Sequence, residues 1–203
     1  MTAGTLAWLL SAATFAVAMS ATPGPNNAMV AASGANFGFA RTLPHMAGVT
    51  VGFPAMLVAV ALGAGDLMRA APMLHGALKW IGVAYLLWLA GRIATARPAV
   101  AAAGSRARPF TFAQAALFQW VNPKAWIIAL GAVATYTTTR WMVVQSLLLA
   151  VLFVLVTLPA LAFWTMTGVG AARLLRSERA LRTFNRVMAG LLVLSLLPLL
   201  REF

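Results

Sequence analysis

The chain has 203 residues, of which 62% are hydrophobic and only 9% are charged, whereas an ordinary soluble domain carries roughly 25% charged residues. One globular core could not bury this much apolar surface, so the composition excludes an ordinary soluble protein. The net charge of +12 does not indicate a nucleic-acid binder, because the basic residues lie in short segments between apolar blocks and not on one soluble face. The chain contains no cysteine, which excludes disulfides, thiol catalysis and cysteine-based metal sites.

Long uncharged blocks predict membrane-spanning helices. No Asp, Glu, Lys or Arg occurs in residues 1–40, 42–65 or 141–172, and about 20 apolar residues are enough to cross the hydrocarbon of a bilayer. We expect the first block to be retained and not cleaved as a signal peptide, because residues 1–8 carry no positive side chain. In chain order, we predict six spans: 5–32, interrupted near Pro23; 43–64; 73–95; 112–135, interrupted near Pro123; 143–168; and 183–200.

The basic residues between the spans predict the orientation. The loops after the first, third and fifth spans fall on one side, and they hold Arg41, Arg92, Arg97, Arg106, Arg108, Arg173, Arg176, Arg179, Arg182 and Arg186. The other side holds Arg69, Lys79, Arg140 and Arg201. Because the more basic loops of a membrane protein face the cytoplasm, we expect a multi-pass protein of the bacterial inner membrane with both termini in the periplasm.

The chain divides into two halves. Residues 96–111 form a small, basic linker between a first repeat, 1–95, and a second repeat, 112–203. Each half has three spans, and an odd number makes the second half enter the membrane from the opposite side, as in inverted-repeat transporters. Pro25 and Pro123 are 98 residues apart and fall in the first span of their halves. We therefore predict an all-α membrane protein of two inverted three-helix repeats with broken first and fourth helices.

The two interruptions have the composition of a ligand site. They read Thr-Pro-Gly-Pro-Asn-Asn at 22–27 and Gln-Trp-Val-Asn-Pro-Lys at 119–124. Backbone groups freed by proline must be satisfied by protein or by a wet cavity. A half-helix N-terminus suits a carboxylate and free carbonyls suit an ammonium group, so an α-amino acid fits both. The expected substrate-binding residues are Pro23, Gly24, Pro25, Asn26, Asn27, Gln119, Asn122, Pro123 and Lys124.

Lys124 is the most unusual of these residues, because a cation near the bilayer centre costs about 3 kcal/mol or more. Its ammonium can donate to carbonyls freed at the interruptions or meet the substrate's carboxylate, and both arrangements stay open. The only acids are Asp66, Glu178 and Glu202, all expected near span ends. Proton coupling needs a titratable group within reach of both sides, and the candidates are Asp66 and Lys124.

Several other residues are expected to have structural roles. Gly34, Gly38, Gly48 and Gly52 are spaced for close helix packing. Pro54 and Pro159 are expected to shape packing only. His45 and His75 are expected at the membrane interface.

Around the interruptions the sequence resembles the lysine exporter (LysE-type) translocators. The first signature is Thr22-Pro23-Gly24-Pro25-Asn26 with the four glycines, a third-span motif is Leu78 to Leu86, and a second signature is Phe118 to Ala125. The resemblance implies export of amino acids or close derivatives, driven by the proton-motive force without a cofactor or metal. Together with the helix faces that carry these small glycine residues, the resemblance also implies a homodimer. Many members have a Pro-Gln-Phe element after the second signature, whereas residues 130–136 read Leu-Gly-Ala-Val-Ala-Thr-Tyr here, so the threonine and homoserine substrates of that branch do not carry over.

Other functions fit the sequence less well. An exporter of metal ions would need several carboxylate, histidine or cysteine ligands, and the chain has three acids, two histidines and no cysteine. An intramembrane enzyme would need a Ser–His or Asp–Asp arrangement within the spans, and none is apparent. A membrane subunit without transport activity would have no use for two costly interruptions. The alternatives kept are an exporter of another small solute or of a metal ion, and a non-transporting subunit.

Overall fold

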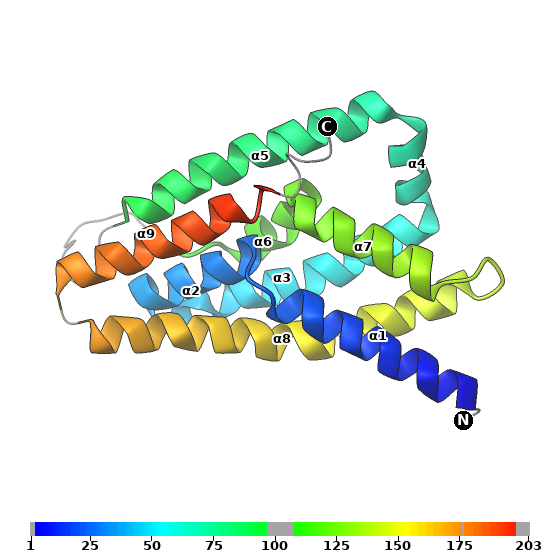
Figure 1. Ribbon diagram of the computed structural model, residues 1–203, viewed down its shortest axis with the longest axis horizontal. Helices are drawn as coiled ribbons and strands as arrows, with labels where there is room; N and C mark the ends of the chain where they lie inside the picture. The colour runs from blue at the N-terminus through cyan, green and yellow to red at the C-terminus, as the bar shows by residue number, and fades with distance from the viewer. Residues whose placement is uncertain (1–2, 97–107, 176, 198–203) are drawn as a thin grey trace.

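The computed structural model describes residues 3–96, 108–175 and 177–197, and every regular element in this part of the chain is a helix (Figure 1). Four helical segments are long and apolar enough to cross a membrane: Gly4–Ala21, Phe39–Ala70, Pro72–Ala94 and Met142–Leu174. They correspond to the first part of the first predicted span and to the second, third and fifth spans. The predicted fourth span is divided among α6, η3 and α7, none of which is long enough to meet these criteria. The predicted sixth span extends beyond the described residues.

The first half begins with two successive helices. Helix α1, Ala3–Ala21, ends just before Pro23, and α2, Pro25–Phe37, starts with a proline at its first position, where the missing N–H costs nothing. Gly38 ends α2 with a φ of 84°, a conformation that glycine adopts without strain. The expectation that Gly38 packs against a neighbouring helix is wrong, since a side-chain atom there would meet open space.

The next helices differ from the predicted bounds at their ends. Helix α3, Phe39–Ala59, starts four residues before the predicted span because Gly38 sets its beginning. It contains Pro44 and Pro54 and continues through a π-helical segment, η1 (Val60–Ala64), into the short α4, Gly65–Ala70. Helix α5, Pro72–Ala94, lies within one residue of the prediction at each end.

The second half is interrupted as well. Helix α6, Phe112–Phe118, starts with a capping box between Thr111 and Gln114. A 3-10 turn, η3 (Gln119–Val121), separates it from α7, Pro123–Tyr136. Helix α8, Met142–Leu174, runs six residues past the predicted span, and α9, Glu178–Leu194, starts five residues early because Ser177 caps it.

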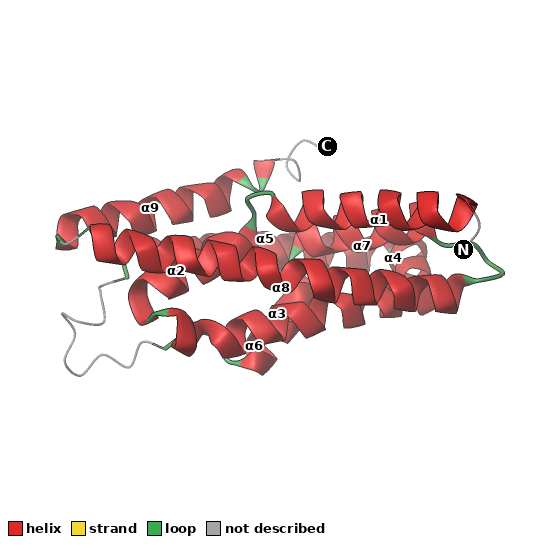
Figure 2. Ribbon diagram, turned by 90° about the horizontal axis from the view of Figure 1, so that it is seen from below, coloured by secondary structure: helices red, strands yellow, loops and turns green. Residues whose placement is uncertain are grey.

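The helices lie along one long axis (Figures 1 and 2). Helices α1 and α2 follow one another in the same direction, with the N-terminus at the right of Figure 1. Five helix ends gather at the left of that view: the ends of α2, α5 and α8 and the starts of α3 and α9. We call this region the basic end, because these helix ends carry Arg41, Arg92, Arg173, Arg179 and Arg182. The linker residues 97–107, together with Arg176, Arg201 and Glu202, lie outside the described residues.

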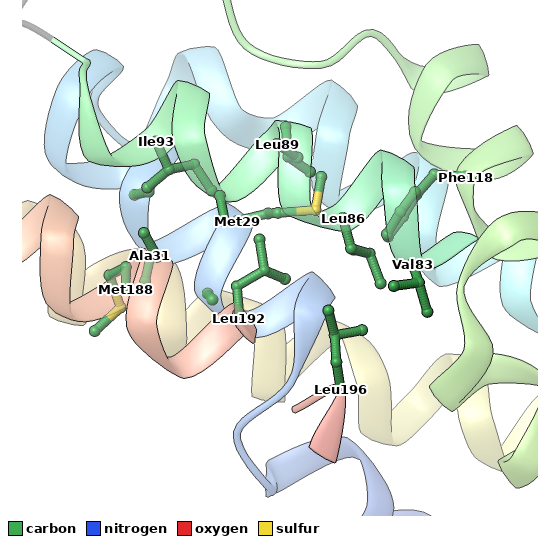
Figure 3. Packing of buried hydrophobic residues seen from close by; sticks show 14 residues of the cluster. Met29, Ala31, Val83, Leu86, Leu89, Ile93, Phe118, Met188, Leu192 and Leu196 are labelled. Atoms are coloured by element: carbon green, nitrogen blue, oxygen red, sulfur yellow. The ribbon is translucent and has the colours of Figure 1, made fainter. Parts of the chain in front are cut away.

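Two hydrophobic clusters make up most of the core. One joins α2, α5 and α9, with Met29 pointing between Leu86, Leu89 and Leu192 (Figure 3). The other joins α1, α3, α7 and α8 around Phe53 and Phe153, whose rings make an edge-on contact at 4.9 Å. Each of these two clusters contains helices from both halves of the chain, so within the described residues the two halves share these cores.

Glycines bring helix backbones into direct contact. Gly34 of α2 lies against the backbone of Thr165 in α8, and Gly168 of α8 lies against the backbone of Ala31 in α2. Gly48 and Gly52 of α3 make the same kind of contact with α6. A methyl group at any of these four positions would collide with the facing backbone, which explains why only glycine fits there.

Candidate functional site

The two interruptions meet in the interior through a reciprocal pair of amides. Asn26 Nδ2 donates to Gln119 Oε1 at 2.9 Å, and Gln119 Nε2 donates to Asn26 Oδ1 at 3.2 Å. Gln119 is fully buried and also donates to the carbonyl of Ala115 at 2.9 Å. Two residues 93 positions apart are thus tied together where α2 begins and α6 ends.

Lys124 bridges the same two segments. Its Nζ donates to the carbonyl of Thr22 at 3.0 Å, to Thr22 Oγ1 at 2.9 Å, and to the carbonyl of Pro23 at a longer 3.4 Å. The aliphatic part of Lys124 lies against Gly24, where an added Cβ would come within 2.8 Å of Lys124 Cδ. The ammonium therefore satisfies carbonyls released at the end of α1, which is one of the two arrangements that the sequence left open.

The other two asparagines hold the ends of the interruptions. Asn27 Nδ2 donates to the carbonyls of Ser20 and Thr22, each at 2.9 Å. Asn122 caps α7, because its Oδ1 accepts from the backbone N–H of Lys124 at 3.2 Å. Both side chains are buried, and their contacts fix the backbone on which Lys124 and the start of α2 are mounted.

The start of α2 has no side-chain cap. Gly24 occupies the N-cap position, and no side-chain oxygen accepts a hydrogen bond there. The first N–H groups of an α-helix have no partner within the helix, and they carry a partial positive charge. The start of α2 can therefore accept an anionic group from a ligand.

A cavity of about 50 Å³ lies between these elements. Six predicted site residues line it: Gly24, Pro25, Asn26, Asn27, Asn122 and Lys124. Pro23 and Pro123 are chain neighbours of these residues, and neither they nor Gln119 are among the lining residues. The rest of the wall is apolar, with Val49, Phe53 and Phe153, apart from a hydroxyl pair in which Ser20 Oγ and Thr157 Oγ1 are 3.3 Å apart. Among the described residues, no acidic side chain lines this central cavity.

Asp66 lies away from the central cavity. It is in the first turn of α4, at the right of Figure 1, and its carboxylate pairs with Arg69 at 2.9 Å. The side chain of Asp66 is 81% exposed. Of the two proton-coupling candidates, only Lys124 lies at the central cavity.

His45 is a buried polar residue that lies outside the predicted binding site. Only 2% of His45 is exposed, so its side chain is enclosed by protein, and its expected place at the membrane interface stays a prediction. It lines a second cavity, of about 470 Å³, nearer the basic end. Its position within the uncharged block 42–65 was the only sign of burial in the sequence. The side chain of His75 lies outside the described residues.

Comparisons with known proteins agree on one kind of relative. Residues 17–201 match the family described as "LysE type translocator". A "Cysteine/O-acetylserine efflux protein" of Klebsiella pneumoniae subsp. pneumoniae is 32% identical over 185 residues, which cover 89% of this chain and 90% of that protein. The protein of the same name from Escherichia coli (strain K12) is 31% identical, over 89% of this chain and 91% of its own length. No solved structure matches the chain.

Proposed function

The chain belongs to the LysE type translocator family, and we propose that it exports small, neutral α-amino acids or their close derivatives across the bacterial inner membrane. It is a multi-pass membrane translocator and not an enzyme. The observation that carries the proposal is the arrangement of Lys124 and the uncapped start of α2 around a cavity with no acidic lining.

The carboxylate of the substrate is the group that this arrangement attracts. It would accept hydrogen bonds from the N–H groups at the start of α2 and from the ammonium of Lys124. In the described conformation Lys124 occupies the carbonyls of Thr22 and Pro23. We propose that substrate binding draws Lys124 to the carboxylate, and that the substrate's own ammonium takes over these carbonyls. The zwitterion would then replace the two hydrogen bonds to carbonyls that Lys124 gives up.

The size and lining of the central cavity favour a short side chain. Its volume of about 50 Å³ corresponds to roughly four water molecules, at about 10–15 Å³ each by this measure. A lysine or arginine substrate would bring a second positive charge beside Lys124, with no carboxylate in the lining to balance it. The hydroxyls of Ser20 and Thr157 suit a small polar side chain. Cysteine and O-acetylserine, which give the relatives their name, are zwitterions without a positive side chain and so meet the charge requirement of this lining.

We propose that the spans are those predicted from the sequence, with α1 and α2 forming one broken span and α6, η3 and α7 another. The parallel course of α1 and α2 supports this, as does the gathering of Arg41, Arg92 and Arg173 at one end of the molecule (Figure 1). By the positive-inside rule that end is cytoplasmic and both termini are periplasmic. Two repeats, 1–95 and 112–203, would then have inverted orientations.

Export is proposed to be driven by the proton-motive force. A membrane potential contributes about 2.3 kcal/mol per charge per 100 mV, so exchange moving one net charge at that voltage sustains roughly a 50-fold gradient. Lys124 is the better candidate for exchanging the proton, because it lies at the central cavity whereas Asp66 is exposed and paired with Arg69. A homodimer stays a prediction, since Gly34, Gly48 and Gly52 pack within one chain.

Transport by the purified protein in proteoliposomes tests the proposal. We would measure uptake of radiolabelled L-cysteine under reducing conditions, O-acetyl-L-serine and L-lysine, with and without an imposed proton gradient. We expect saturable uptake of the two neutral substrates, accumulation that a protonophore abolishes, and no uptake of lysine. Faster transport of L-lysine than of the two neutral substrates would refute the proposal that the central cavity selects neutral amino acids. Transport of a divalent metal ion, with no amino acid moved, would establish the alternative function.

A further inference from the structure

The central cavity is too small for the proposed substrates in the described conformation. Its volume of about 50 Å³ corresponds to roughly four water molecules, and every α-amino acid has more non-hydrogen atoms than that. Protein interiors are closely packed, so they gain space only when groups in the wall rearrange. Part of the wall must therefore move when a substrate binds, and the packing around the cavity indicates which part.

Two phenylalanines form the wall that faces away from the basic end. Phe53 lies in α3, which starts at the basic end, and Val49 lies about one turn nearer that end. Phe153 lies in α8, which ends at the basic end, and Thr157 lies about one turn nearer to it. The two rings meet edge-on at 4.9 Å, and only 6% of Phe53 and 1% of Phe153 are exposed. The pair therefore lies between the central cavity and the far end, as we call the end with the N-terminus at the right of Figure 1.

Further ring contacts continue from this pair toward the far end. The ring of Phe153 lies 6.4 Å from that of Phe15 in α1, and Phe15 lies 5.6 Å from Tyr136, the last residue of α7. The ring of Tyr136 meets that of Trp8 at 6.3 Å. We call these five side chains the aromatic row. It joins α1 and α3 of the first half to α7 and α8 of the second, and a substrate that leaves along the long axis toward the far end meets these rings first.

The walls on the basic side are held by backbone contacts. Helix α8 lies directly against the backbone of α2 at Gly168, and α3 lies against that of α6 at Gly48. These contacts leave no room for a side-chain atom, so the walls they carry shift only when whole helices move. Helices α1 and α7 have no such contact at their glycines, since Gly4 and Gly131 meet open space. A phenylalanine ring, in contrast, can turn about its own side-chain torsions while its helix stays in place.

We propose that Phe53 and Phe153 close the central cavity toward the far end and set the largest side chain that the protein transports. Phe153 is the specificity-determining residue, because it is the more deeply buried of the two and contacts both Phe53 and Phe15. Substrate binding separates the two rings, which enlarges the cavity and opens the way along the aromatic row. The size limit rests on the proposed function, whereas the closure of the cavity by the pair does not.

Uptake of neutral amino acids of different size tests the size limit. In proteoliposomes we would compare L-cysteine with L-methionine, which has the same charge and a longer side chain. We expect Phe153→Ala to raise the methionine-to-cysteine ratio of kcat/KM by about tenfold or more, and Phe153→Leu to raise it by less. Phe153→Leu also covers the case in which the larger truncation impairs folding. An unchanged ratio in both variants would overturn the size limit.

Phe184→Ala is the matched control for these variants. It removes the same ring from α9, where Phe184 packs against the other core cluster and lines neither cavity. We expect this variant to leave the methionine-to-cysteine ratio unchanged. A ratio that rises equally in Phe184→Ala would also overturn the size limit, because general loosening of the fold would then explain the gain.

Cysteine labelling tests the closure without transport. The chain has no cysteine, so Thr157→Cys introduces a single thiol into the lining of the central cavity, one turn from Phe153. We would measure its rate of reaction with a membrane-impermeant maleimide in lipid nanodiscs. We expect the rate to rise several-fold when Phe153→Ala is added and to stay the same when Phe184→Ala is added. Equal rates with and without Phe153→Ala would overturn the closure.

The two assays separate this inference from the proposed function. If no amino acid is transported but Phe153→Ala accelerates the labelling of Thr157→Cys, the closure stands and the proposed function fails. If cysteine is transported but Phe153→Ala changes neither the ratio nor the labelling, the proposed function stands and the aromatic pair is only part of the core.

Discussion

Replacing Lys124 by methionine should impair transport far more than it impairs folding. The ammonium makes two good hydrogen bonds, at 3.0 and 2.9 Å, and one long one at 3.4 Å. Two charge-assisted bonds contribute about 3–6 kcal/mol in total, but holding a cation at membrane depth costs about 3 kcal/mol or more. The two effects largely cancel, so we expect a loss in unfolding free energy of about 0–3 kcal/mol for Lys124→Met.

In substrate binding, the hydrogen bond lost with the ammonium of Lys124 is not offset by any saving in free energy. A carboxylate that loses its hydrogen bond to an ammonium loses about 1.5–3 kcal/mol, which corresponds to about a 10- to 150-fold higher substrate concentration at half-maximal transport. The assay is the initial rate of L-cysteine uptake into proteoliposomes over a range of concentrations, with thermal unfolding measured on the same samples. Lys79→Met is the matched control, because it removes the same charge from α5 outside both cavities.

Lys124→Arg keeps the charge but changes its shape, and we expect it to retain part of the transport. An unchanged half-saturating concentration in Lys124→Met would refute the role of Lys124 in binding the carboxylate. A Lys79→Met variant with the same defect would attribute the effect to net charge and not to the site.

Three further predictions concern the interruptions, the packing and the coupling. The Asn26→Ala and Gln119→Leu double-mutant cycle should give a coupling energy of about 0.6–1.7 kcal/mol in unfolding; additive effects would show that the amide pair does not stabilise the fold. Gly168→Ala should lower the unfolding free energy by about 1–3 kcal/mol. Gly170→Ala, which meets open space on the same helix, should instead raise it by about 0.5–1 kcal/mol, since alanine is the better helix former. Equal effects would contradict the close contact of α2 and α8. Asp66→Asn should leave proton-driven accumulation unchanged, since the carboxylate is exposed and its ion pair contributes about 0–1 kcal/mol; loss of accumulation would assign the coupling to Asp66.

The interruptions were predictable because their causes are local. Proline and glycine exclude regular helix wherever they cluster, so the end of α1 before Pro23 and the start of α7 at Pro123 follow from a few neighbouring residues. The start of α9 was harder to predict, because one hydroxyl, that of Ser177, extends the helix into an arginine-rich segment.

The contacts between distant segments could not be read from the sequence. The pairing of Asn26 with Gln119 depends on how the two halves pack, and so does the burial of His45 against Phe110. A single histidine in an apolar helix looks the same whether its helix face meets lipid, water or another helix. For the same reason the spacing of the glycines predicted packing in general but could not separate Gly38, which ends a helix, from Gly48, which meets α6.

The glycine contacts limit how the molecule can move. They join α2 to α8 and α3 to α6, and each pair takes one helix from each half of the chain. Sliding within such a pair would bring a residue that has a Cβ opposite the facing backbone, where only glycine fits, so we expect each pair to move as a unit. If transport proceeds by alternating exposure of the central cavity to the two sides of the membrane, we expect these mixed pairs, and not the two proposed repeats, to move as rigid bodies. A cysteine cross-link within the α2–α8 pair should therefore leave the cycle intact, whereas a cross-link between two pairs should stop it.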